Sequence, residues 1–166
     1  MQDQPRGVVA SGEPRRTVRL GLTGLVILAA LGLLSRPAEA ITIKALAIIG
    51  KNDNSGVDAR IPASVRQALV STFRYNSYAL HSSAGASAAV NQRVTLPLAG
   101  PYALAVKPLE VRGEGRDRRI LLQVDIVRGD VRVVGAAVWL KPGRYWLLGG
   151  PAVHDGVLIV AMAVSD

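Results

Sequence analysis

The segment Ile120–Trp139, ILLQVDIVRGDVRVVGAAVW, decides the fold predicted for this chain, because two apolar runs flank a glycine-containing turn as in a β-hairpin. A glycine in the first position of a two-residue turn is typical of type II′ geometry, so Gly129-Asp130 is the expected turn. Counting outward from that turn gives the expected cross-strand pairs: Arg128 with Val131, Ile126 with Val133, Val124 with Gly135, Leu122 with Ala137 and Ile120 with Trp139.

This register predicts which face of the hairpin is buried. The paired residues from Ile126 to Ile120 form an apolar face with large side chains opposite small ones, so we expect that face in the core with Trp139 pointing inward. The other face carries Gln123, Asp125 and Arg132, with Asp125 diagonal to Arg132. Its remaining residues are apolar enough to predict partial cover: Leu121, Val127, Val134 and Val138.

Further strands flank this hairpin on both sides. Before it, a turn at Gly100-Pro101 joins an alternating run from Arg93 to the strand Tyr102–Val111, and the charged, glycine-broken segment Arg112–Arg119 is expected to be an exposed hairpin tip. After it, strands are predicted over 144–148 and 157–164, with turns at Pro142-Gly143 and Asp155-Gly156. The last run has almost no polar alternation, which predicts a central strand covered on both faces.

The first part of the predicted domain contributes one helix. A strand is expected over 41–49, followed by a polar loop over 50–56. Pro62 suits the start of an amphipathic helix of about three turns, whose apolar face is formed by Val65, Ala68, Leu69, Thr72 and Phe73. The segment Ser82–Ala89 is predicted to be either a loop or a weak edge strand. The chain is therefore predicted to be α+β, a twisted, mainly antiparallel sheet of six to eight strands with one helix packed on it.

The first forty residues are typical of a secretory signal peptide with its helix. Arg15, Arg16 and Arg19 precede the apolar run Leu20–Leu34, and the small residues Ala38 and Ala40 mark an expected cleavage site. The alternative is an uncleaved membrane anchor, although the run is shorter than the roughly 20 residues that span a bilayer. We therefore expect residues 1–40 to be a signal peptide and residues 41–166 to form one exported domain, periplasmic or extracellular. With an uncleaved anchor, the domain would be held by one span outside the cytoplasm.

Composition limits the chemistry of this domain. The chain has no cysteine, so an exported domain of about 125 residues must be stabilised by packing, and thiolate zinc sites are excluded. Basic residues exceed acidic ones, with a formal net charge of +8 for the whole chain, which favours anionic partners. Acidic polysaccharide, lipid headgroups and extracellular nucleic acid are the anionic partners expected in an envelope.

The layout of the predicted domain resembles an uncharacterised group of small exported bacterial proteins. The resemblance rests on Val57-Asp58 after the first loop, on 73–78 (FRYNSY), on Leu96-Pro97, and on the closing segment 149–159 with Gly149-Gly150-Pro151 and Asp155-Gly156. It covers nearly all of the domain. Since that group has no assigned activity, the resemblance implies a fold and a location only.

Candidate chemical residues are few. Asp53, Asn54, Ser55 and Asp58 lie in a glycine-containing loop, but the spacing fails the pattern of a calcium-binding EF-hand loop, so a turn is expected. The histidines, His81 and His154, are not accompanied by cysteine ligands. A structural role is expected for His154 beside its turn.

A hydrolase would combine one of these histidines with an aspartate and a nearby serine, namely Ser77, Ser82 or Ser83, and no nucleophile-elbow sequence supports that choice. Glu110 and Glu114 lie beside the charged hairpin tip, where exposed carboxylates do not have the separated pKa values that acid/base catalysis needs. No phosphate-binding glycine loop is present. We therefore expect no catalytic activity, no cofactor and no metal, and a small hydrolase remains the least favoured alternative.

The basic tip is the strongest candidate for a contact. Its arginines, Arg112, Arg116, Arg118 and Arg119, could bind an anionic ligand, or could simply be a solvated loop that protects a strand edge. No aromatic residue is interleaved with them, which disfavours specific nucleic-acid binding. The other aromatic residues could form a sugar-stacking platform or pack in the core: Tyr75, Tyr78, Tyr102, Tyr145, Trp139 and Trp146.

The sequence thus predicts a non-catalytic, exported interaction or structural module of the cell envelope. Its partner would be an envelope protein. The alternative is an anionic envelope polymer or membrane surface bound through the basic tip. Salt separates these hypotheses, because exposed charge contacts are screened and an apolar interface is not.

Overall fold

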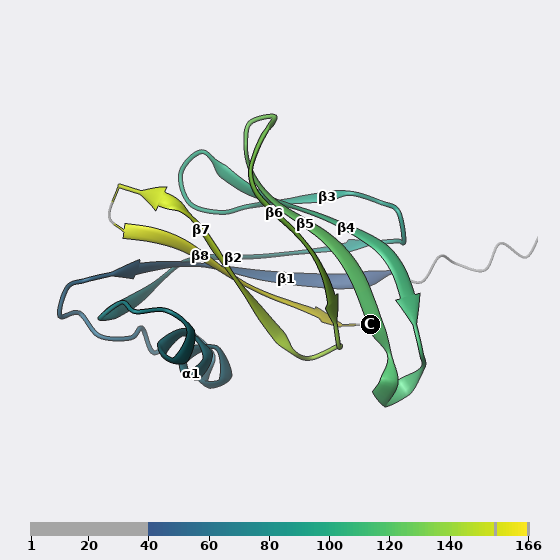
Figure 1. Cartoon of the computed structure of the whole chain (residues 1–166), viewed down its shortest axis with the longest axis horizontal. Coiled ribbons are helices and arrows are strands. Elements are labelled where there is room, and N and C mark those ends of the chain that lie inside the picture. Colours follow the sequence, from purple (N-terminus) through teal and green to yellow (C-terminus); the bar gives the residue numbers. More distant parts are fainter. Residues whose placement is uncertain (1–39, 155, 166) are drawn as a thin grey trace, which may run out of the picture. The chain divides into compact units, whose positions relative to one another are not determined.

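The computed structural model describes residues 40–154 and 156–165, and strands dominate this part of the chain (Figure 1). In chain order the elements are β1 (Ile41–Lys51), α1 (Ala63–Thr72), β2 (Ser77–Ala88), β3 (Val94–Pro97), β4 (Tyr102–Arg112), the 3₁₀ turn η1 (Gly115–Asp117), β5 (Arg119–Arg128), β6 (Val131–Leu140), β7 (Tyr145–Val153) and β8 (Gly156–Ser165).

The eight strands of the described residues are divided between two antiparallel sheets. One has the order β2-β1-β8-β7, and the other is the meander β3-β4-β5-β6. The predicted α+β class, with mainly antiparallel strands and one α-helix, is confirmed. The division arises because β6 and β7 do not pair: the Lys141–Arg144 turn takes the chain from one sheet to the other. The segment Ser82–Ala89 lies almost wholly in β2, an edge strand, so the second of its two predictions is confirmed.

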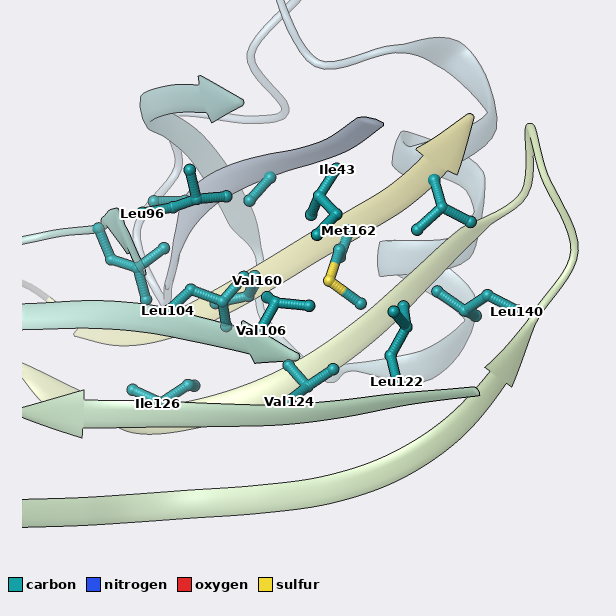
Figure 2. Close-up of a cluster of buried hydrophobic side chains, with 14 of the residues drawn as sticks. Ile43, Leu96, Leu104, Val106, Leu122, Val124, Ile126, Leu140, Val160 and Met162 are labelled. Atoms are coloured by element: carbon teal, nitrogen blue, oxygen red, sulfur yellow. The ribbon is translucent and has the colours of Figure 1, made fainter. Parts of the chain in front are cut away.

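The sheet β2-β1-β8-β7 has an apolar core on each face. On one face its side chains meet those of β3, β4, β5 and β6, including Ile43, Val160, Leu104, Val124 and Met162 (Figure 2). On the other face Ile48 and Ile159 pack with Val65 and Leu69 of α1. Figure 1 shows α1 and the second sheet on opposite sides of this layer. Because β8 is buried on both faces over most of its length, its lack of polar alternation is explained, as predicted.

The helix is joined to the sheet by a buried tyrosine. Tyr78 of β2 is 1% exposed, and its hydroxyl lies 2.9 Å from the carbonyl oxygen of Phe73 and 3.2 Å from that of Leu69. These carbonyls belong to the C-terminal end of α1, where the Leu69 oxygen also accepts from Phe73 N and the oxygens beyond it have no intrahelical donor. Tyr78 therefore positions the end of α1 on the sheet.

The hairpin β5–β6 has the predicted turn but not the predicted register. Arg128 pairs with Val131 around Gly129-Asp130, and Gly129 has φ 59°, as the first position of a type II′ turn requires. A β-bulge then places one extra residue, Val133, in β6, so that Ile126 pairs with Val134 rather than Val133. Every later pair is shifted by one residue.

This shift corrects the predicted face of β6. Leu122, Val124 and Ile126 of β5 are fully buried, as expected. The inward residues of β6 are instead Val134, Ala136, Val138 and Leu140, while Val133, Gly135, Ala137 and Trp139 are exposed. The prediction that Trp139 points into the core is wrong, because counting from the turn assumed unbroken pairing. The diagonal contact is confirmed: Arg132 Nη1 lies 3.8 Å from Asp125 Oδ1.

Candidate functional site

The basic tip is the hairpin end between β4 and β5. Arg112 and Arg119 are directly paired across the two strands, so their side chains leave the same face of the sheet. Arg116 lies in η1 and is exposed, as are Arg112 and Arg119, whereas Arg118 is half-buried. The structure thus brings together the predicted contact residues at one end of the sheet.

The tip is held by its own backbone. Gly113 has φ 70°, and a Cβ atom there would lie 2.6 Å from the carbonyl oxygen of Asp117. That conformation is favourable for glycine and strained for other residues. Backbone hydrogen bonds from Asp117 to Glu114 and from Arg118 to Gly115 close the η1 turn. The arginines are therefore presented on a turn of defined shape.

Arg112 is more constrained than the sequence indicated. Its Nε lies 2.6 Å from Oε1 of Glu110 and its Nη2 lies 3.2 Å from Oε2, and these side-chain hydrogen bonds raise the pKa of Arg112. The guanidinium also lies over the indole of Trp139, with Cζ 4.9 Å from the ring centroid. Arg112 is thus held between a carboxylate and an aromatic ring.

Trp139 lies beside the tip, although the sequence pattern predicts that its side chain points into the core. It pairs with Leu121 on the outer face of β5–β6, two residues along β5 from Arg119, and is 38% exposed. The β-bulge at Val133 turns it outward. We name Arg112, Arg116, Arg119 and Trp139 the arginine–tryptophan surface. One feature of the sequence does indicate that Trp139 faces outward. Counting back along β6 from the turn at Pro142-Gly143 places Leu140 and Val138 on one face, and Trp139 then lies on the opposite face.

The tip is not uniformly basic. Between positions 110 and 119 four arginines are accompanied by three acidic residues, Glu110, Glu114 and Asp117. Glu110 is paired with Arg112, and the exposed arginines Arg116 and Arg119 have the exposed carboxylates of Glu114 and Asp117 beside them. The side chains of Arg116 and Arg119 form no ion pair with any described residue, so an anionic ligand would contact these two arginines.

A second site lies at the other end of the sheet, where a cleft of about 400 Å³ opens. We name it the end cleft, and its described lining comprises Ile49, His81, Ala99, Gly100, Pro101, Tyr102, Arg128, Ala152, Val153 and His154. The structure brings His81 and His154 to one cleft although they are far apart in the sequence. The lining residues that are described include no serine, aspartate or glutamate, and Asp155 lies outside the described residues. The hydrolase alternative, which needs Asp155, therefore stays untested.

The loop after β1 is organised by its own hydrogen bonds. Asp53 accepts hydrogen bonds from Ser77 Oγ at 2.5 Å and from Ser55 N at 3.0 Å, and these lower the pKa of Asp53. Asp58 pairs with Arg60 at 2.7 Å and accepts from Leu80 N, and the Arg60 side-chain hydrogen bonds hold the pKa of Asp58 well below its usual range. Within the described ranges no group of three or more histidine, cysteine or acidic residues could hold a metal ion.

The aromatic residues do not form one platform. Tyr75 and Tyr78 meet edge to face, with ring centroids 6.2 Å apart, in the core beneath α1. Tyr145 packs against that same core, and Trp146 against the core between the sheets. Tyr102 lines the end cleft, so Trp139 alone accompanies the arginines of the tip.

The predicted signal segment lies outside the described residues, except for exposed Ala40. Signal peptide, cleavage and anchor therefore stay predictions. In the part of the chain that the structure describes, no helix has the length and hydropathy needed to cross a membrane.

Comparisons with known proteins give no relative. No protein-family model matches the chain, and no curated protein or solved structure is significantly similar to it. The resemblance to small exported bacterial proteins is not tested by these comparisons and stays a prediction.

Proposed function

We propose that this chain is a non-catalytic binding module of the cell envelope, and that its arginine–tryptophan surface binds an acidic polysaccharide. The observation that carries the proposal is the exposed Trp139 ring beside Arg112, on the same sheet face as Arg119. In the sequence the arginines of the tip have no aromatic neighbour. In the folded chain the β-bulge at Val133 turns Trp139 outward, so that its ring lies beside Arg112.

The chemistry of the surface suits a charged sugar. Arginine presents a planar fork of donors that matches a carboxylate, and an indole ring offers an apolar face with a polar edge. A uronic acid unit has both complementary features, a carboxylate and an apolar C–H face. Arg116 and Arg119 would contact the carboxylates, while the exposed part of Trp139 would contact the ring.

Arg112 has a different role in this proposal. Its guanidinium is already paired with Glu110, so it contributes little net attraction to a polymer. Instead it positions the indole, since it lies over the ring of Trp139. This division predicts that loss of Arg116 and Arg119 weakens electrostatic attraction, whereas loss of Arg112 alters the aromatic contact.

The cellular setting of the proposal comes from the sequence. The basic, apolar and small-residue order of residues 1–40 predicts export, and acidic polysaccharides are among the anionic polymers of an envelope. An exported domain without cysteine can keep a rigid surface through its two apolar cores.

The experiment is retention of the purified protein on immobilised polygalacturonate at low and high salt. We expect retention at low salt, release at high salt, and loss of retention in the double variant R116S/R119S. The matched control is R66S/R74S, which removes two arginines in and just after α1, on the opposite side of the sheet β2-β1-β8-β7 from the tip. Neutral dextran, single-stranded DNA and anionic lipid vesicles are compared in parallel.

Other outcomes would contradict the proposal. Equal retention of R116S/R119S and R66S/R74S would show attraction by net charge alone. Stronger binding to DNA or to vesicles than to polygalacturonate would assign the surface to a different polyanion. Capture of one envelope protein at both salt concentrations, with no retention on polygalacturonate, would favour a protein interface.

A further inference from the structure

The end cleft lies at the opposite end of β4 and β5 from the arginine–tryptophan surface. Tyr102 begins β4 and Arg128 ends β5, and these two residues are directly paired at the cleft. Arg112 and Arg119 are paired at the other ends of the same strands. The cleft is therefore a separate site, and its volume of about 400 Å³ is of the size that small ligands occupy.

A β-bulge places His81 at this cleft. Ala47 pairs with Ser82 and Ile48 pairs with Leu80, so His81 is an extra residue of β2 with no partner on β1. Leu80 packs on the helix side of the sheet, while His81 shares the lining of the cleft with Ile49 from the core between the sheets. Bulges redirect a side chain at the expense of regular pairing, and they are frequent beside binding sites.

A second irregularity shapes the facing side. Gly149 pairs with Ile159 and Ala152 pairs with Val157, so two residues of β7 oppose Leu158 alone. A Cβ atom on Gly150 would lie 2.9 Å from both the Leu158 carbonyl oxygen and Ile126 Cδ1, which explains why this bulge contains glycine. The bulge leads directly into the residues of β7 that line the cleft.

The lining combines an apolar interior with a cationic mouth. Ile49 and Ala99 are 7% and 4% exposed, and Val153 is half-buried beside them. Arg128 and His81 are exposed, and neither side chain forms a hydrogen bond or ion pair with any residue that the structure describes. No carboxylate is present among the described lining residues. A guanidinium at the mouth of an apolar cleft, with no carboxylate among the described lining residues, is complementary to a small anion with an apolar body.

We propose that the end cleft binds a small monocarboxylate with a short hydrocarbon chain. The carboxylate pairs with the Arg128 guanidinium in a bidentate, charge-assisted contact, and the chain lies against Ile49, Ala99 and Val153. His81 supplies a further donor at the mouth. This site is independent of the polysaccharide proposal, because no residue is shared between the two surfaces.

The test is titration of the purified protein with octanoate, followed by calorimetry and by backbone amide shifts in NMR spectra. Octanol has the same chain without the charge, and acetate has the charge without the chain. We expect octanoate to shift amides of the cleft, and both octanol and acetate to bind about tenfold more weakly or worse. R128Q should weaken octanoate binding by about tenfold or more, the loss expected for a charge-assisted hydrogen bond.

Two further variants keep the test decisive. A152L narrows the cleft without changing charge and should also weaken octanoate binding, while R116S/R119S at the distant tip should leave it unchanged. Circular dichroism of each variant confirms folding. Octanol binding as tightly as octanoate, an unchanged affinity in R128Q, or amide shifts outside the cleft would each overturn the proposal. A cleft that fails this test while the tip still retains polygalacturonate would leave the proposed function intact.

Discussion

The guanidinium carbon of Arg112 lies 4.9 Å from the ring centroid of Trp139, on the outer face of the sheet β3-β4-β5-β6. A cation over an indole is attracted by the electrons of the ring, and the contact is worth about 0.5–1 kcal/mol at exposed sites. It exists because the extra residue Val133 reverses the faces of β6. The candidate site thus depends on one bulge.

The exposure of Trp139 can be measured by fluorescence. The variant W146F leaves Trp139 as the remaining tryptophan, and W139F leaves Trp146, which packs against the core between the sheets. We expect W146F to show red-shifted emission and strong iodide quenching, and W139F to show the reverse. Protected, blue-shifted emission from Trp139 would mean that the β5–β6 pairing has no bulge. If Trp139 is exposed as expected, the double variant W146F/R112A should differ in emission from W146F, because it lacks the Arg112 cation over the indole ring.

The faces of β5 can be compared with two neighbouring leucines. Leu122 is fully buried between the sheets, while Leu121 lies half-buried on the outer face. L122A should lower the free energy of unfolding by about 3 kcal/mol, since it leaves a cavity in a packed core. L121A should lower the free energy of unfolding by clearly less than L122A does. Urea unfolding of both variants measures the difference, and equal losses would contradict the assigned faces.

The hydroxyl of Tyr78 links β2 to α1, so removing it is expected to destabilise the folded protein. Y78F should lower the free energy of unfolding by about 1–2 kcal/mol, because the Phe73 and Leu69 carbonyls lose a buried donor. Tyr145 packs against the same core and, among the described residues, has no hydrogen bond through its hydroxyl, so Y145F is the control. An effect of the same size in both variants would show that the helix end does not depend on Tyr78.

The Asp58–Arg60 pair predicts a dependence of stability on acid. Hydrogen bonds from the Arg60 side chain lower the pKa of Asp58 in the folded protein, so the stabilisation is fully present above the ordinary aspartate pKa. It is lost progressively as the pH falls below about 4. D58N should therefore be less stable than the wild type near neutral pH, with the gap narrowing in acid.

Urea midpoints measured from pH 7 to about pH 2 check this. The exposed Asp117 provides the control variant D117N, for which we expect no such narrowing gap. A difference between wild type and D58N that stays constant with pH would contradict the assigned pair.

Much of the fold follows from local pattern. The turn at Gly129-Asp130, the exposed tip at 112–119 and the doubly buried β8 are each specified by residues within a few positions of one another. The α+β class follows from the sum of such elements. The division into two sheets does not, because it depends on whether β6 or β1 becomes the neighbour of the β7–β8 hairpin, a choice made by long-range packing.

The candidate sites were less accessible from sequence because each depends on a bulge. At Val133 and at His81 one extra residue changes the face to which side chains belong, and no glycine or proline at either position marks the bulge. Trp139 was accordingly predicted inward, and His81 was not predicted to meet His154. The arginines of the tip were found because charge and glycine mark an exposed turn directly.

We propose that Arg116 and Arg119 attract an acidic polysaccharide to a surface that includes Trp139. The affinity of the protein for polygalacturonate as a function of salt concentration tests this, measured for the wild type, R116S/R119S, W139A and R66S/R74S. We predict that the affinity of the wild type and of R66S/R74S falls steeply with salt, because exposed charges are screened. W139A should bind more weakly with the same salt slope, and R116S/R119S should lose both affinity and slope. A salt slope that R116S/R119S leaves unchanged would contradict a binding role for these two arginines.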